Sequence, residues 1–206
     1  MLSRLILASG SAARLGVLRA AGIEPVVSPS MVDEDEVVAE LGPLPVPELV
    51  RRLALAKAQD VSNRLAPQLG DVIVGADSLF EVGDRLLGKA RSEADVVARW
   101  QSMRGRSGSL HTGHAVIRAG RTVSAVATTR VEFADITDDE IAAYAATGEP
   151  LDAAGSFTLE GRAAPFIERI DGDPSNVIGL SMPLLRRLLG QLGVGITELW
   201  HRPYGA

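Results

Sequence analysis

Short apolar runs alternate along the chain with stretches in which apolar positions recur at helical spacing. Residues 2–7 and 72–76 are apolar runs that predict buried strands, and the second, β-branched at its start, is typical of a central parallel strand. Apolar residues three to five positions apart between residues 48 and 65 predict an amphipathic helix. This alternation favours an α/β fold in which helices flank a mixed, twisted sheet.

The middle of the chain is richer in predicted strands. Residues 79–87, with Gly83-Asp84 at their centre, predict a β-hairpin, and residues 111–118 and 122–133 alternate as an antiparallel pair joined by Ala119-Gly120. Shorter apolar segments predict further strands at residues 24–28, around Phe157 and at residues 165–170. We expect one domain, residues 1–206, in two lobes with a central cleft.

Helix boundaries are marked by residues that cap helix ends. Gly22 is placed to end the first helix, and Ser92 to begin one that runs to about residue 103. Thr137 and Glu140 form a capping-box pattern that opens a helix to about residue 147. Another helix is expected at 183–189.

Composition narrows the classes of function. A net charge of −5 and a pI of 5.3 argue against a nucleic-acid polymer as partner, because such binding needs a basic face. With no cysteine, disulfides and thiolate nucleophiles are excluded, and the ligands of any metal would be oxygens. The sequence has neither a signal-peptide pattern nor an apolar run of about 18 residues, so we expect a cytoplasmic protein without a membrane partner.

The turn after the first predicted strand carries Ser9, Ser11 and Arg14 at the start of a helix. A helix N-terminus offers free N–H groups, and the two hydroxyls and the guanidinium add donors of the kind that a phosphate group requires. Serine is also among the commonest N-caps, so a purely structural role stays open.

Two acidic positions could supply carboxylates for a metal. Asp77 follows the end of the predicted central strand, where open α/β sheets place their ligands, and Gly75 would let a ligand approach the backbone. Glu34 lies in the acidic run 33–36, which is also typical of solvated loops and helix N-termini. Together with the serine-rich turn, these positions suggest nucleotide chemistry.

Other candidates are weaker by themselves. Lys57 on a helix and Lys89 in a turn are of the kind that ordinarily faces solvent. His111 and His114 lack metal-ligand spacing, and structural roles are expected for both. Neither a P-loop nor a G-x-G-x-x-G motif follows the first strand.

Seven short motifs occur in one order between residues 5 and 190. They read S-G-S-x-x-R (9–14), V-D-E (32–34), L-A-K-A (55–58), G-A-D-S (75–78), G-K (88–89), E-P-L-D-x-A-G (149–155) and I-D-G-D (170–173). In this order the chain resembles the Maf-like nucleotide pyrophosphatases, a family also linked to septum formation. The resemblance implies a fold similar to that of the inosine-triphosphate pyrophosphatases, a divalent metal (Mg²⁺ or Mn²⁺), and hydrolysis of a nucleoside triphosphate to monophosphate and diphosphate. Homodimers are common in this family, so a homodimer is a further expectation, although the sequence does not locate an interface.

Carried over residue by residue, the resemblance implies catalytic roles for Asp77, Lys57 and Lys89. Asp77 would take the proton of the attacking water, and the two lysines would hold the phosphate chain. Glu34 would bind the metal together with Asp77. The implied substrate-binding residues are Ser9, Ser11, Arg14 and Glu160.

The chain also departs from the family pattern. The usual S-P-R-R reads Ser11-Ala12-Ala13-Arg14, with one cation fewer, and the usual G-K-P reads Gly88-Lys89-Ala90, which loosens the turn that aims Lys89. Glu160 in place of Gln, with Ser156-Phe157 in place of Ala-Tyr, resembles the branch that acts on methylated guanosine triphosphate or on a broader set.

Three functions follow, in order of preference. The first is a metal-dependent nucleoside triphosphate pyrophosphatase acting on canonical or modified nucleotides. The second is a non-catalytic, nucleotide-sensing regulator of septum formation, favoured only by the arginine missing at Ala13. The third, an α/β hydrolase of phosphomonoesters, would release orthophosphate and no diphosphate.

Overall fold

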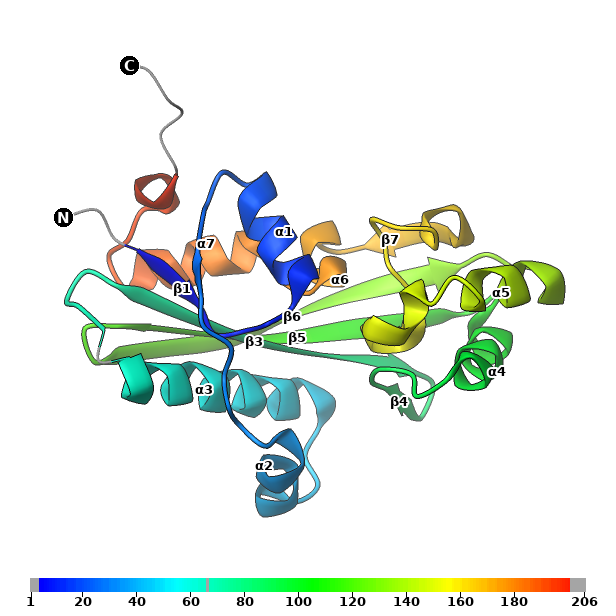
Figure 1. Ribbon diagram of the computed structural model, residues 1–206, viewed down its shortest axis with the longest axis horizontal. Helices are drawn as coiled ribbons and strands as arrows, with labels where there is room; N and C mark the ends of the chain where they lie inside the picture. The colour runs from blue at the N-terminus through cyan, green and yellow to red at the C-terminus, as the bar shows by residue number, and fades with distance from the viewer. Residues whose placement is uncertain (1–3, 66, 201–206) are drawn as a thin grey trace. The chain divides into compact units, whose positions relative to one another are not determined.

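A seven-stranded mixed sheet runs through the protein, and helices flank it, as the computed structural model shows (Figure 1). The structure describes residues 4–65 and 67–200. The strand order is β2-β1-β3-β5-β6-β7, with β4 paired to β3. The strands are β1 (Leu5–Leu7), β2 (Val26–Val27), β3 (Val72–Val82), β4 (Arg85–Leu87), β5 (Ser107–Arg118), β6 (Arg121–Phe133) and β7 (Ile167–Asp171). The predicted α/β fold with a mixed sheet is confirmed.

The chain divides into two compact units. The first comprises the described parts of residues 1–77, 112–127 and 179–206, and the second comprises residues 78–111 and 128–178. The strands β3, β5 and β6 contribute to both. The predicted cleft stays a prediction.

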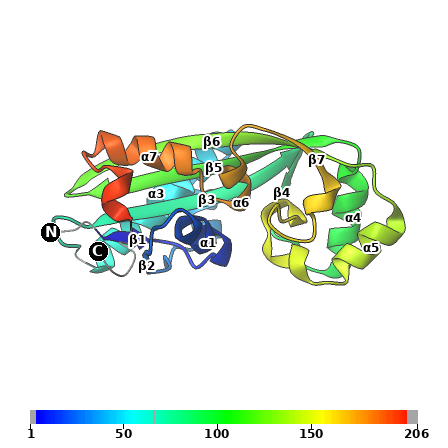
Figure 2. The same cartoon turned by 90° about the horizontal axis from the view of Figure 1, so that it is seen from above.

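In the first unit, helices cover both faces of the sheet. The helix α3 (Val46–Leu65) lies along one face, and α1 (Ala12–Ala20) and α7 (Met182–Gln191) lie on the other (Figures 1 and 2). A further helix, α2 (Glu34–Leu41), packs near α3. The short helix η4 (Ile196–Leu199) is the last helical segment in the described part of the chain.

Two glycines let α3 approach the sheet closely. A Cβ atom on Gly75 of β3 would lie 2.3 Å from the carbonyl oxygen of Ala54, and one on Gly113 of β5 would lie 2.1 Å from that of Val50. Real Cβ atoms do not come this near to backbone, so only glycine fits. The expectation that Gly75 makes room for a ligand is therefore wrong, because the helix α3 fills that space.

The second unit has an aromatic core under a pair of helices. The helix α4 (Glu93–Met103) packs against α5 (Asp138–Ala145). Short helical segments follow at η1 (Glu149–Asp152), η2 (Ala154–Ser156), η3 (Ala164–Phe166) and α6 (Pro174–Ile178). Edge-to-face ring pairs with centroids 5.0–6.0 Å apart link Phe80, Trp100, Phe133, Tyr144, Phe157 and Phe166.

Local sequence signals placed several elements correctly. Thr137 and Glu140 form both bonds of the predicted capping box, and Ser92 caps α4. The 79–87 hairpin is present, with Gly83 at a positive φ in the turn between β3 and β4. The predicted strand at 24–28 is shorter in the structure, where β2 comprises only the two residues after Pro25. These residues, Val26 and Val27, pair with Ile6 and Leu7 of β1.

Two predictions about strands are wrong. Phe157 is not in a strand: it follows η2, where its ring packs against Phe80 and Phe133 in the core. The strand β3 does not end before Asp77, since it continues to Val82 in order to pair with β4. Asp77 nevertheless lies beyond the part of β3 that pairs with β1, which ends at Val74.

None of the described helices is both long and apolar enough to span a bilayer.

Candidate functional site

Lys57 joins two carboxylates in the first unit. Its Nζ atom lies 2.6 Å from Oδ1 of Asp77 and 2.7 Å from Oε1 of Glu34. The side chains of Lys57 and Asp77 are each 9% exposed, whereas that of Glu34 is 53% exposed. The cluster thus has a buried ion pair on one side and a solvent-accessible carboxylate on the other.

Three elements bring these side chains together. Lys57 lies on α3 and Asp77 on β3, and the close approach of α3 at Gly75 brings the lysine to the aspartate. Glu34 begins α2, whose N-cap is Asp33, so the acidic run is the first turn of a helix, one of the two alternatives that the sequence left open. Carboxylates are favoured there by the helix dipole.

The turn between β1 and α1 forms the structure expected from its serines. Ser11 is the N-cap of α1, and its Oγ accepts the N–H of Arg14. The Oγ of Ser9 accepts Nη1 of Arg14 at 3.0 Å and the N–H of Ser11 at 3.2 Å. Nε of Arg14 donates to the carbonyl of Gly179 at 2.9 Å, so Nε and Nη1 of its guanidinium both have an acceptor.

Charge links this turn to the lysine cluster. Burial raises the pKa of Asp77, and the charges of Lys57 and Arg14 oppose that shift. Burial in turn lowers the pKa of Arg14, and the charges of Asp77 and Glu34 oppose it. Two cations and two carboxylates therefore interact in one region of the first unit, and Glu34 lies on its solvent-exposed side. The structure brings together the predicted residues Ser9, Ser11, Arg14, Glu34, Lys57 and Asp77.

The donor set of this cluster suits a hard divalent cation. Glu34 and Asp77 present carboxylate oxygens around one ammonium group. No group of three or more Asp, Glu or His side chains that could hold a metal occurs among residues 4–65 and 67–200. Mg²⁺ is commonly bound by one or two carboxylates together with substrate phosphates, so two carboxylates fit a metal that binds with a nucleotide.

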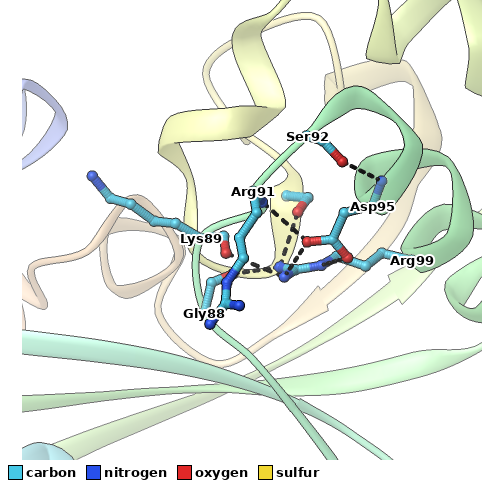
Figure 3. A network of polar contacts seen from close by, with 7 residues as sticks. Gly88, Lys89, Arg91, Ser92, Asp95 and Arg99 are labelled. Carbon is cyan, nitrogen blue, oxygen red and sulfur yellow. Dashed lines mark hydrogen bonds and ion pairs between the residues drawn. The ribbon is translucent and has the colours of Figure 1, made fainter. Parts of the chain in front are cut away.

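Lys89 and Glu160 belong to the second unit. The carbonyl of Lys89 accepts a hydrogen bond from Arg99, and its side chain extends away from the Arg99 network (Figure 3). Glu160 is exposed in the turn between η2 and η3. That turn is fastened to Glu149, which accepts from the hydroxyl of Thr158 and from the N–H of Arg162. The roles carried over for Lys89 and Glu160 stay predictions.

The two histidines of β5 have the structural contacts expected of them. His111 contacts Thr128 and Glu81 within the second unit. In the first unit, Nδ1 of His114 donates to the carbonyl of Thr112, and Nε2 accepts the N–H of Ser181, the N-cap of α7. These contacts fix the Nδ1–H tautomer of His114.

Sequence reasoning missed Arg99. This residue of α4 is buried and bonds to the Gly88-Lys89 segment, which lies 10 or 11 positions earlier in the chain. An arginine on an amphipathic helix carries no signal of such contacts, so only the structure could identify it.

Comparisons with known proteins agree with the family that the order of the sequence motifs suggests. The model of the family described as "Maf-like protein" matches residues 4–192. The nucleoside triphosphate pyrophosphatase of Streptomyces coelicolor is 56% identical over 200 residues, which cover 96% of this chain and 94% of that protein. The protein of the same name from Nocardia farcinica is 50% identical and covers 98% of this chain and 99% of its own. Among solved structures, the Ham1 protein of Staphylococcus aureus is 15% identical, with a TM-score of 0.40 over 64% of this chain and 72% of that chain.

Proposed function

Since this chain belongs to the Maf-like protein family, whose relatives above are named nucleoside triphosphate pyrophosphatases, we propose that it hydrolyses nucleoside triphosphates to nucleoside monophosphate and diphosphate. The observation that carries the proposal is the Asp77–Lys57–Glu34 cluster, coupled by charge to Arg14 at the N-terminal turn of α1. It combines a buried carboxylate with two cations, which an attack by water on a polyanion requires.

Asp77 is the base in this proposal. A water molecule attacks the α-phosphorus and gives its proton to Asp77. A new bond forms between the water oxygen and phosphorus as the bond from phosphorus to the bridging oxygen breaks, and the electron pair of that bond leaves with the diphosphate. The raised pKa of Asp77 strengthens it as a base relative to an ordinary aspartate, provided that it is ionised.

The cations hold the phosphate chain while negative charge develops on the leaving group. Lys57 and Arg14 do this in the first unit, and Lys89 is proposed to do so as well. In the contacts described, the hydroxyls of Ser9 and Ser11 act as acceptors, which leaves their O–H protons for a phosphate oxygen. When bound through Glu34 and Asp77, Mg²⁺ or Mn²⁺ would supply further charge stabilisation for the phosphates.

We extend the proposal to modified nucleotides, such as methylated guanosine triphosphate. This extension rests on Glu160, an exposed carboxylate at the position that the family resemblance assigns to substrate binding. The neighbouring Ser156 and Phe157 are buried and bond or pack within the core of the second unit. Glu160, rather than the Ser156-Phe157 pair, is therefore the residue that can contact a base.

Product analysis in ¹⁸O-labelled water tests the proposal. The purified protein is incubated with a panel of canonical and methylated nucleoside triphosphates, with Mg²⁺, with Mn²⁺ and with chelator. We expect monophosphate and diphosphate, with the label in the monophosphate, and no turnover with chelator. Release of orthophosphate and nucleoside diphosphate would contradict the proposal. Binding of nucleotides without any turnover would favour the nucleotide-sensing regulator.

A further inference from the structure

The guanidinium of Arg99 is saturated by contacts within the second unit (Figure 3). Nε and Nη2 donate to the two carboxylate oxygens of Asp95 at 3.0 and 2.8 Å. Nη2 also donates to the carbonyl of Lys89 at 3.1 Å, and Nη1 donates to the carbonyl of Gly88 at 2.6 Å and to Oγ of Ser156 at 3.3 Å. All five N–H groups of the side chain therefore have an acceptor.

These acceptors come from separate pieces of chain. Gly88 and Lys89 lie in the segment that follows β4, and Ser156 ends η2. The carbonyl of Gly88 also accepts the N–H of Gly155 at 3.3 Å, so the two pieces touch directly. Asp95 connects Arg99 to the same segment a second time, because its carboxylate also accepts the N–H of Arg91 at 3.0 Å.

The η2 side of this network has little freedom to move. Ser156 has a φ of 61°, which is uncommon for a residue other than glycine, and it is fully buried. Its carbonyl accepts Nε1 of Trp100 at 2.8 Å. A Cβ atom on Gly155 would lie 2.7 Å from the Phe80 ring. Arg99 therefore fastens the Gly88-Lys89 segment to a rigid part of the core.

On this basis, and resting on the proposed function, we propose that Arg99 is a positioning residue for Lys89: it fixes the backbone from which the side chain of this phosphate-binding lysine starts. The side chain of Lys89 leaves the network in the direction away from Arg99 (Figure 3). The residue after Lys89 is Ala90, which does not restrict the backbone as a proline would. Arg99 supplies the restriction through hydrogen bonds instead.

Amide exchange measured by NMR tests the anchoring without any nucleotide. Two amides report on the network, those of Arg91, bonded to Asp95, and of Gly155, bonded to Gly88. In Arg99→Lys, which keeps the charge but loses the planar fork, both should exchange at least about tenfold faster than in the wild type. Unchanged exchange of both amides would overturn the proposal.

Arg104→Lys is the matched control. Arg104 lies at the end of the same helix and donates to Asp138 and to the carbonyl of Ile136, so its replacement loosens α4 from α5 without touching the network. Its Arg91 and Gly155 amides should exchange as in the wild type. If Arg99→Lys does not fold, Asp95→Asn takes its place. This substitution weakens the network by changing the carboxylate that pairs with Arg99, and the side chain of Asp95 is one-third exposed.

A double-mutant cycle tests the link to Lys89. We expect kcat/KM to fall at least about tenfold in Arg99→Lys and by less than about twofold when the same change is made in a Lys89→Ala background. Arg104→Lys should leave kcat/KM within about twofold in both backgrounds. Equal losses from Arg99→Lys in the two backgrounds would overturn the proposal. A wild-type protein that cleaves no nucleotide would instead refute the proposed function, and the amide measurements distinguish that case.

Discussion

The ammonium group of Lys57 lies 2.6 Å from the carboxylate of Asp77, and both side chains are almost fully buried. This pair is the centre of the candidate site, and the same ammonium group reaches Glu34 at 2.7 Å. Removal of one member of a buried ion pair leaves the other without its compensating charge. Each substitution in the cluster therefore has consequences for its neighbours.

Lys57→Met should move the acid limb of the pH profile of kcat/KM to higher pH. Burial already raises the pKa of Asp77 above the usual aspartate value, and Lys57 opposes that shift by favouring the carboxylate. Without the lysine the pKa rises further, so the base becomes protonated, and activity is lost, at a higher pH than in the wild type. The measurement is kcat/KM against pH for both proteins.

Arg52→Met is the control for this profile. It removes one positive charge from the same helix, but Arg52 is half exposed and pairs with Glu48. Its acid limb should coincide with that of the wild type. A limb that stays in place in Lys57→Met, or that moves to lower pH, would refute the role assigned to the pair.

Glu34→Gln should raise the Mg²⁺ concentration that gives half-maximal activity by about tenfold or more. The amide keeps the size of the side chain but loses the charge that a hard cation prefers. Glu36→Gln is the control. Glu36 lies in the same first turn of α2 as Glu34, but of these two residues Glu34 is the one whose carboxylate is described in contact with Lys57. Identical Mg²⁺ titrations of the two variants would argue against Glu34 as a ligand.

Gly75→Ala should destabilise the protein by about 3 kcal/mol, near the upper end of overpacking costs. The added methyl group would meet the backbone of α3, which cannot give way as a flexible side chain does. Gly16→Ala, in α1 with nothing within 4 Å, should instead stabilise the protein by up to about 1 kcal/mol. Denaturant unfolding measures both, and equal effects of the two substitutions would contradict the close packing of α3 on β3.

Asp71→Asn should lower stability at neutral pH and flatten its dependence on acid pH. Hydrogen bonds from Arg4 at 2.7 and 2.9 Å lower the pKa of Asp71 below the unfolded value. The stability that this carboxylate contributes is therefore complete above the unfolded pKa of about 3.9 and is lost as the pH falls through the folded pKa. Urea unfolding at pH 7 and at about pH 3 checks this expectation.

The exposed Asp84 in the β3–β4 turn offers the comparison for Asp71. Asp84→Asn should unfold as the wild type does at both pH values. If Asp71→Asn loses as much stability near pH 3 as at pH 7, the Arg4–Asp71 pair is not the origin of the effect.

Sequence signals that act over a few residues predicted the fold well. The N-caps Ser11, Ser92 and Thr137 were predictable because each side chain bonds to an N–H three residues ahead. The strand predicted around Phe157 is wrong, because the environment of this residue depends on contacts that are distant in the sequence. A short apolar segment does not reveal that its ring belongs to a core built from distant aromatic residues.

The candidate site likewise contains residues that could be predicted from the sequence and residues that could not. The turn with Ser9 and Arg14 could be predicted from a strand, a helix and their junction. Lys57 looked like a solvent-facing lysine, because its burial depends on how closely α3 approaches β3. Arg99 could not be predicted, since its bonds to Gly88 and Ser156 span 11 and 57 positions of the sequence.

The turnover of Asp77→Asn tests the central claim most directly. Kinetics on the best substrate should show that kcat falls by about two decades or more, the loss expected for a general base. Affinity for a non-hydrolysable analogue should stay within a few-fold, and circular dichroism should match that of the wild type. A kcat close to the wild-type value in a correctly folded Asp77→Asn protein would contradict the assignment of Asp77 as the base.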